Sequence, residues 1–240
     1  MAKFNEEWTV GPHGPLEAID DGLLTVEGEI VMPLGRFPRR MTVARLAGGG
    51  TAIWSGIPLR EPEMRQIEAL GDPKFLIVPG VGHRLDLKPW KQRYPSAKIV
   101  CAPGAREAVE EVLPADGLDS FDDAEVRLEI VPGVGERELA MHVRRGGKLS
   151  LLLNDILANV QHPHGLGAHV LARLMGFGVS RPKMPWVGKR MFVEDEKALA
   201  AAFRAWAAEP DLTRIIVSHG DPITRDVQAV LEGIAAELEG

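Results

Sequence analysis

Short apolar runs separated by glycine, proline and aspartate fill the first third of the chain, and this pattern predicts β-strands. Three such runs span residues 16–20, 22–28 and 29–32. Residues 33–40 combine proline, glycine and arginine and are expected to form a loop. Residues 41–57 hold two more runs on either side of Gly48-Gly49-Gly50, which predicts a β-hairpin.

Helical spacing alternates with buried strands in the next stretch. Met64, Ile67 and Leu70 lie three residues apart and predict a helix that ends at Gly71-Asp72-Pro73. Strands are expected at 75–78 and 98–103, and a second helix at 103–114. This alternation of strand and helix is typical of an α/β fold.

The second half of the chain repeats this order. Strands are predicted at 126–131, 139–143, 148–155 and 214–217, and helices at 194–209 and 222–239. We expect the last helix to begin with Asp221 as its N-cap and Pro222 as its first residue. Two similar halves, about 1–122 and 123–240, predict one α/β domain over residues 1–240. Its expected architecture is a four-layer αββα sandwich, with two facing mixed sheets and outer helices.

The composition narrows the class of protein. The formal net charge is -6 and there is no basic run, which argues against non-specific nucleic-acid binding. No window approaches the roughly 20 apolar residues that a membrane span needs, and the first residues lack the apolar stretch of a secretory signal. A cytoplasmic protein without a membrane partner is therefore expected. The single cysteine, Cys101, lies in a predicted strand and is expected to be a buried apolar residue.

Two polar residues stand at or just after the ends of predicted strands. His219 follows the strand at 214–217, and Gly220 after it permits a tight turn. Asp155 ends the apolar run Leu151-Leu152-Leu153-Asn154-Asp155. The carboxyl ends of strands are where α/β folds collect functional groups, and a buried carboxylate needs a cation or several N–H donors. The alternative is that His219 fills a loop and that Asp155 caps a turn.

The five-residue sequence VPGVG occurs twice, at 78–82 and at 131–135. His83 and Asp86 follow the first copy, and Glu136 and Glu138 follow the second. His83 and Asp86 can converge on one point if a helical turn begins there. The alternative is an aspartate at a helix start beside an exposed histidine.

These segments together resemble the metallo-β-lactamase-fold hydrolases. The sequence FLIVPGVGHRLDL stands where that family has its first histidine-rich motif, and EIVPGVGERELAMHV where it has a second. LSLLLND matches the apolar strand that ends in Gly-Asp, and IIVSHGDP matches the last strand–His–Gly element. The resemblance covers nearly the whole chain in order and implies the αββα fold.

The resemblance also implies a reduced metal site. The first motif keeps His83 and Asp86, and at the second the family histidine is missing, with Glu136 or Glu138 near its place. The family positions imply that Asp155 is a single-metal or bridging ligand and that His219 is a ligand of the second metal. His83, Asp86, Asp155 and His219, with Glu138 as a further candidate, would suit one Zn²⁺, Fe²⁺ or Mn²⁺. A protein that keeps the fold without metal is the alternative.

Residues 158–192 are rich in proline, glycine and histidine and are expected to form an irregular loop after Asp155. His162, His164, His169 and Trp186 are the candidate substrate-facing or lid residues. Basic and aromatic side chains interleave here, which would suit an anionic substrate or a self-association surface. A solvated loop with a few anchoring aromatics is the alternative.

Two functions follow from this pattern. The first is metal-dependent hydrolysis of a small ester, lactone, thioester or phosphoester, with Asp155 and His219 as the catalytic pair and a metal-activated water. The second is a non-catalytic binding or assembly module that uses the loop at 158–192 as its contact surface. Homo-oligomer formation is open in both cases. The chain has no G-x-S-x-G motif and no strand–helix G-x-G-x-x-G, so serine catalysis of the α/β-hydrolase type and a dinucleotide cofactor are not expected.

Overall fold

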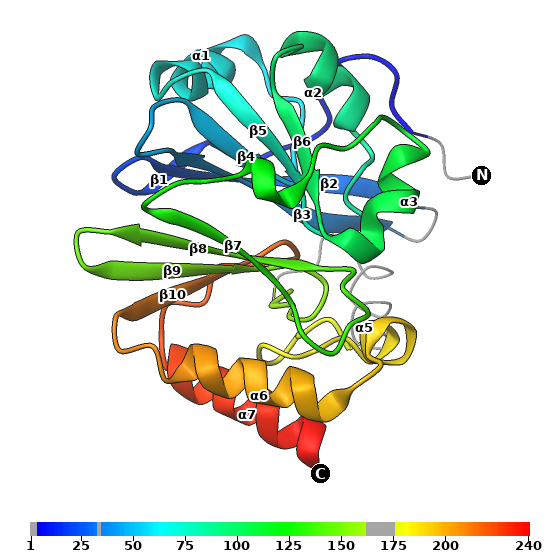
Figure 1. Ribbon diagram of the computed structural model, residues 1–240, viewed down its shortest axis with the longest axis vertical. Coiled ribbons are helices and arrows are strands. Elements are labelled where there is room, and N and C mark those ends of the chain that lie inside the picture. Colours follow the sequence, from blue (N-terminus) through cyan, green and yellow to red (C-terminus); the bar gives the residue numbers. More distant parts are fainter. Residues whose placement is uncertain (1–3, 33–34, 162–175) are drawn as a thin grey trace.

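The computed structural model describes residues 4–32, 35–161 and 176–240 and shows four layers (Figure 1). Two sheets face each other in the middle. Helices α1 (Glu61–Ala69) and α2 (Leu87–Arg93) lie outside the first sheet, and α6 (Glu196–Ala207) and α7 (Val227–Glu239) lie outside the second. The predicted αββα sandwich is confirmed.

The first sheet has the strand order β1-β2-β3-β4-β5-β6. Its strands are β1 (Glu17–Asp20), β2 (Leu23–Met32), β3 (Gly35–Arg45), β4 (Thr51–Trp54), β5 (Pro73–Val78) and β6 (Lys98–Cys101). Strands β1 to β4 pair antiparallel and β4 to β6 pair parallel. The sheet is therefore mixed, and the hairpin predicted around the three glycines is the β3–β4 connection.

The second sheet has the order β10-β9-β8-β7. Its strands are β7 (Val126–Ile130), β8 (Leu139–Arg145), β9 (Lys148–Leu153) and β10 (Leu212–Val217). The β8–β9 hairpin is antiparallel as predicted, whereas β9 and β10 are parallel. Because β9 and β10 run in the same direction, Asp155 and His219 follow strand ends that lie side by side at the same end of the sheet.

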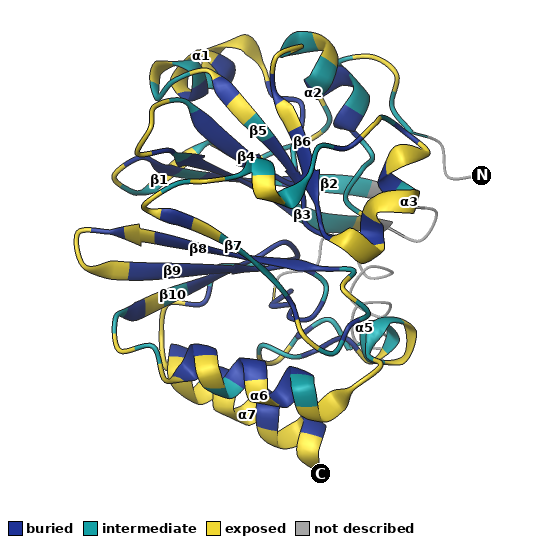
Figure 2. Ribbon diagram, viewed as in Figure 1, coloured by how far each residue is buried: buried dark blue, intermediate teal, exposed yellow. Residues whose placement is uncertain are grey.

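Apolar side chains form a core in each of the three spaces between layers. Alternate residues of β9 show this division, because Leu149, Leu151 and Leu153 pack with α6 and α7 whereas Leu152 packs against the first sheet. A third cluster lies under α1 and α2 and includes Met64. Figure 2 shows most of β9 buried and the outward faces of α6 and α7 exposed.

Short helical segments complete the described chain. They are a 3₁₀ turn at Pro103–Ala105, α3 (Arg106–Glu110), a second 3₁₀ turn at Leu118–Ser120 and α5 (Trp186–Phe192). Cys101 is buried as expected, and burial raises the pKa of its thiol. None of the helices in the described part of the chain is long and apolar enough to cross a membrane.

Several predicted elements were wrong in extent. The helix predicted at 103–114 is a 3₁₀ turn followed by the short helix α3 (Arg106–Glu110). The runs at 22–28 and 29–32 are one continuous strand, β2, and much of the expected loop at 33–40 belongs to its partner β3. The last helix begins at Val227 and not after Asp221, because Ile223 exchanges two backbone hydrogen bonds of 2.8 Å with Ile215 of β10. That bridge keeps the chain before Val227 extended. Helix α5 was not predicted, because residues 158–192 carry no helical period.

The second VPGVG copy holds the start of α6 through backbone hydrogen bonds. The Gly133 carbonyl accepts hydrogen bonds from the backbone N–H groups of Glu194 and Asp195, at 2.8 and 3.1 Å. Asp195 is the N-cap of α6 and accepts from Lys197 and Ala198 N–H groups at 3.0 Å. This loop therefore fixes the start of α6.

The same loop also touches the first half of the chain at Gly104. The Gly104 N–H donates to the Glu136 carbonyl at 2.8 Å, and a Cβ at Gly104 would lie 2.2 Å from the Gly135 carbonyl oxygen. We predict that Gly104→Ala lowers the free energy of unfolding by about 1–3 kcal/mol, because backbone must move apart to admit the methyl group. Urea unfolding measures this change.

Gly48→Ala is the matched control, because Gly48 has no atom within 4 Å of a built Cβ and needs no left-handed backbone. Equal unfolding free energies for the two variants would contradict the close contact at Gly104.

Candidate functional site

His219 is held in place by backbone contacts on both sides. The Ser218 N–H donates to the Leu153 carbonyl at 3.1 Å, and the His219 carbonyl accepts from the Asn159 N–H at 3.0 Å. Gly220 follows with φ +103, and a Cβ there would lie 2.1 Å from the Asn159 carbonyl oxygen. Glycine is therefore required directly after the histidine for the turn to form.

The imidazole of His219 has a defined tautomer. Its Nδ1 lies 2.9 Å from the Pro38 carbonyl oxygen on β3. A carbonyl only accepts, so Nδ1 carries the hydrogen, and in the neutral ring Nε2 keeps its lone pair. That Nε2 lies 2.9 Å from Oδ1 of Asp155. Two atoms with lone pairs approach this closely only with a proton or a cation between them.

Asp155 lies just beyond the end of β9, where two other segments fix its backbone. The carboxyl of Glu138 is buried, and the backbone N–H groups of Asp155 and Ile156 lie near enough to act on its pKa. On the other side, α5 packs closely, since a Cβ at Gly188 would lie 3.2 Å from the Asp155 carbonyl oxygen. The Asp155 side chain is thereby directed at the two histidines.

His83 follows β5, in the turn that the first VPGVG copy forms. Its N–H donates to the Gly80 carbonyl at 3.1 Å. Its Nε2 lies 3.4 Å from Oδ1 of Asp155, and its Nδ1 lies 2.7 Å from the Ser55 hydroxyl. The His83 and His219 rings are 5.1 Å apart between centroids. Three segments of the chain therefore meet at one carboxylate oxygen.

One ligand atom each from His83, Asp155 and His219 lies within 4.8 Å of the others. The set of two imidazole nitrogens and one carboxylate oxygen suits Zn²⁺ or Fe²⁺. Two ligands about 2.1 Å from a tetrahedral ion lie roughly 3.4 Å apart. The His83 contact with Asp155 has this length, and the His219 contact is shorter, at 2.9 Å. The Nδ1 hydrogen bonds to Pro38 and Ser55 are the outer partners that ligating imidazoles usually have.

The three residues line a cavity of about 340 Å³. Its other walls include Ile30, Phe37, Arg39, Ser55 and Leu85. This volume lies at the lower end of the range for small-molecule sites.

Burial and charge act in opposite directions on the cluster. Burial lowers the pKa of His83 and outweighs the attraction of Asp155, so the neutral ring is favoured. Burial also acts to raise the pKa of the Asp155 carboxyl, but the two histidines outweigh it and hold that pKa well below its usual range. A neutral imidazole and an ionised carboxylate are the forms that bind metal.

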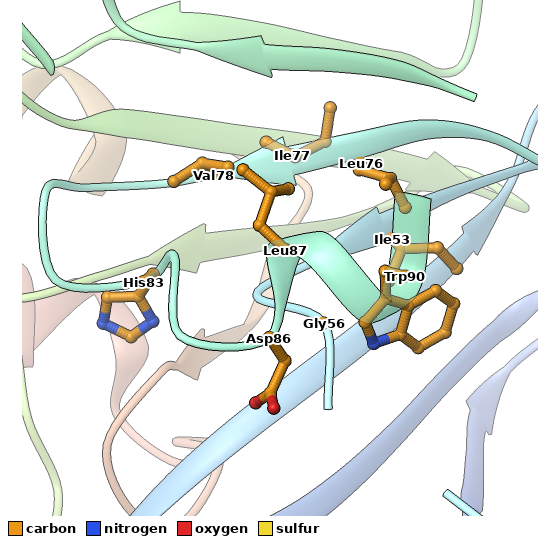
Figure 3. Close-up of a pocket in the computed structure, with 9 residues that line it drawn as sticks. All are labelled: Ile53, Gly56, Leu76, Ile77, Val78, His83, Asp86, Leu87 and Trp90. Atoms are coloured by element: carbon orange, nitrogen blue, oxygen red, sulfur yellow. The ribbon is translucent and has the colours of Figure 1, made fainter. Parts of the chain in front are cut away.

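The structure does not bring Asp86 to this cluster. Its carboxylate forms an ion pair with Arg39 and accepts a hydrogen bond from Asn5 Nδ2 at 2.7 Å. Figure 3 shows the His83 and Asp86 side chains lying apart on the segment between β5 and α2. Asp86 precedes the first residue of α2, so its neighbours are those of the helix start. The expectation that His83 and Asp86 converge on one point is corrected here.

The two glutamates after the second VPGVG copy also differ from the expected ligands. Glu136 is exposed, whereas Glu138 is buried near the backbone of Asp155. Of the lid residues, Trp186 lies half exposed on α5, and His162, His164 and His169 fall outside the described residues. Whether Asp155, His219 and His83 bind metal remains a prediction.

Ser55 is a site residue that the sequence did not indicate. It follows β4 in a left-handed conformation with φ 55 and is 5% exposed. A non-glycine residue in this conformation is held there by its surroundings, and such strain often marks a functional position. No sequence motif indicates Ser55. Its place in the site depends on the parallel pairing of β4 with β5, because Ser55 follows β4 and His83 follows β5.

Comparison with solved structures shows that the chain has the metallo-β-lactamase fold. It superposes on DIM-1 metallo-β-lactamase with a TM-score of 0.64 and 12% identity, over 95% of this chain and 99% of that one. FIM-1 from Pseudomonas aeruginosa, in its mono-zinc form, gives 0.62 and 14%, over 96% and 98%. An enzyme from Erythrobacter litoralis gives 0.61 and 15%, over 92% and 96%. Family models and curated proteins gave no match.

Glu138 should make stability depend on pH. Burial, and then repulsion by Asp155, raises the pKa of its carboxyl well above the ordinary value. The unfolded chain therefore loses this proton first as the pH rises above about 4.3. The stability that Glu138 contributes is lost between that pH and the folded-state pKa. We predict that Glu138→Gln, which keeps the shape of the neutral carboxyl, gains in unfolding free energy relative to wild type as the pH rises.

Urea unfolding of metal-free protein at pH 5, 6 and 7 measures this difference. Glu136→Gln, an exposed site two residues away, is the matched control and should not show the trend. A difference between Glu138→Gln and wild type that stays constant from pH 5 to 7 would be evidence against the buried carboxyl.

Proposed function

We propose that the protein is a metal-dependent hydrolase with a single ion held by His83, Asp155 and His219. The observation that supports this proposal is the placement of three ligand atoms within 4.8 Å in the wall of a 340 Å³ cavity. The substrate class is a small ester, lactone, thioester or phosphoester. A divalent ion bound there would polarise the scissile group and lower the pKa of a water molecule to near neutrality.

The residues of the chain divide the work. Asp155 supplies the negative charge that holds the ion, since its oxygen is the one that both histidines face. His219 presents Nε2 because its Nδ1–H is bound to Pro38. His83 is oriented by the Ser55 hydroxyl and by the turn at Gly80. Ile30, Phe37 and Leu85 keep the reacting group in apolar surroundings.

Elemental analysis tests this proposal directly. Purified protein, offered Zn²⁺, Fe²⁺ and Mn²⁺ in turn, should bind about one ion per chain, because three protein ligands are the usual number at a catalytic site. Asp155→Ala and the isosteric Asp155→Asn should abolish binding. His142→Ala is the control, because His142 is a buried histidine that lies on β8 against Glu129, at 2.9 Å, and not at the cluster.

Metal-loaded wild type should then hydrolyse a member of the four ester classes, and Asp155→Asn should not. Stoichiometric metal in Asp155→Asn would sink the ligand assignment. Wild type without metal would instead support the non-catalytic alternative, a binding or assembly module.

Ser55 should set the affinity for the ion. We predict that Ser55→Ala weakens metal binding about 10- to 100-fold, because the hydroxyl that orients His83 is lost. Ser55→Gly should weaken binding similarly while raising the unfolding temperature, since glycine adopts φ 55 without strain. Competition with a chelating dye measures the affinity.

Ser150→Ala provides the matched control for Ser55. Ser150 is a buried serine in the interior of β9, and its loss should leave the metal affinity unchanged. If Ser55→Ala binds metal as tightly as wild type, Ser55 has no part in orienting His83.

A further inference from the structure

Arg39 lies in the cavity wall beside the candidate metal ligands. It is on β3, two residues after Phe37 and therefore on the same face of the strand. Phe37 pairs with Ile30 of β2, and Arg39 pairs with Gly28. All of Ile30, Phe37 and Arg39 line the same 340 Å³ space. The β2–β3 hairpin therefore presents one cation within an otherwise apolar wall.

The Arg39 guanidinium is held by contacts on the side away from the cavity. Its Nη1 pairs with Asp86, whose side chain is 1% exposed and is also bound by Asn5. Its Nε is buried without a partner. Its Nη2 has no partner among the residues that the structure describes and is not among the buried unpaired atoms, so it remains as a donor for a ligand. A fixed guanidinium with a free N–H group is suited to an anionic oxygen.

The charges around the cavity favour an anion. The ionisable residues that line it are Arg39, His83, Asp155 and His219. Asp86 neutralises Arg39 only from the far side, and it does not line this cavity. A divalent ion would more than offset Asp155, which leaves a net positive cavity in a chain of formal charge -6. A cationic pocket in an acidic surface concentrates anions.

We propose that Arg39 is the anion-binding side chain of the site and that the site takes small organic acids. The substrate would be an ester whose non-reacting part carries an oxyanion, a carboxylate or a phosphate, on a short apolar chain. The assignment of a substrate rests on the proposed hydrolase function. The binding of the anion does not need the reaction, but the net positive charge of the cavity needs the proposed ion. The scissile group would face the three ligands while the oxyanion meets Arg39 Nη2.

Calorimetric titration with three probes of similar shape tests the binding. Butanoate and butylphosphonate carry the two candidate anions, and butanamide is the neutral analogue. Each is titrated into chelator-treated protein and then into zinc-loaded protein, so that binding to the ion alone is separated. Wild type should bind at least one anion more tightly than butanamide. The stronger of the two identifies the carboxylate or the phosphate as the group recognised.

The informative variant is the double change Arg39→Gln with Asp86→Asn, which removes both charges and leaves no buried carboxylate unpaired. It should weaken anion binding roughly 10- to 100-fold, the loss of one charge-assisted hydrogen bond, and leave butanamide unchanged. Arg39→Lys keeps the charge and should lose less. Arg36→Gln is the matched control, because Arg36 is 55% exposed, pairs with Glu29 and does not line the cavity.

Equal anion affinity in wild type and the double variant would overturn the proposal, and so would wild type that binds neither anion in either metal state. The hydrolase proposal fails separately. Arg39-dependent anion binding without hydrolysis of any ester would remove the reaction and leave the anion site. If wild type and the double variant both hydrolyse neutral and anionic esters with equal KM, the hydrolase proposal stands and the anion site at Arg39 is ruled out.

Discussion

A single carboxylate oxygen, Oδ1 of Asp155, is the point on which the arrangement of the site depends. It accepts contacts from two imidazoles that come from opposite sheets, His83 after β5 and His219 after β10. A buried carboxylate is costly without a cation or hydrogen-bond donors. Asp155 is only 22% exposed, so a shift of one sheet past the other at this end would separate a largely buried charge from at least one of its two histidine partners. The cluster therefore links the two sheets as well as forming a candidate metal site.

Strand direction explains why these residues meet. Strands β4 and β5 are parallel in one sheet, and β9 and β10 are parallel in the other. Ser55, His83, Asp155 and His219 all follow the carboxyl ends of these strands. Parallel pairing brings the carboxyl ends of neighbouring strands to the same end of a sheet. Because the two sheets face each other, these two ends lie together. Each residue is then fixed by backbone contacts, such as the Pro38 carbonyl for His219.

Much of the fold was predictable from the sequence, because strand and helix periods in this chain are strong and the order of elements is diagnostic. Asp155 and His219 could be selected because each ends an apolar strand. The pairing of Asp86 with Arg39 and Asn5 could not, since both partners lie more than 40 residues away in the sequence. Ser55 carries no motif, and the start of the last helix was missed because a tertiary bridge from Ile223 to Ile215 overrides the local helix signal.

The two VPGVG copies show how one sequence can serve two unlike purposes. The first copy forms the turn that leads to His83 in the site. The backbone of the second copy binds the residues at the start of α6, and its Val134 is fully buried. A histidine grafted into the second copy would replace a core side chain or disturb the carbonyl that holds α6. Rebuilding a second metal position in this chain would thus be a problem of protein stability before it became one of coordination chemistry.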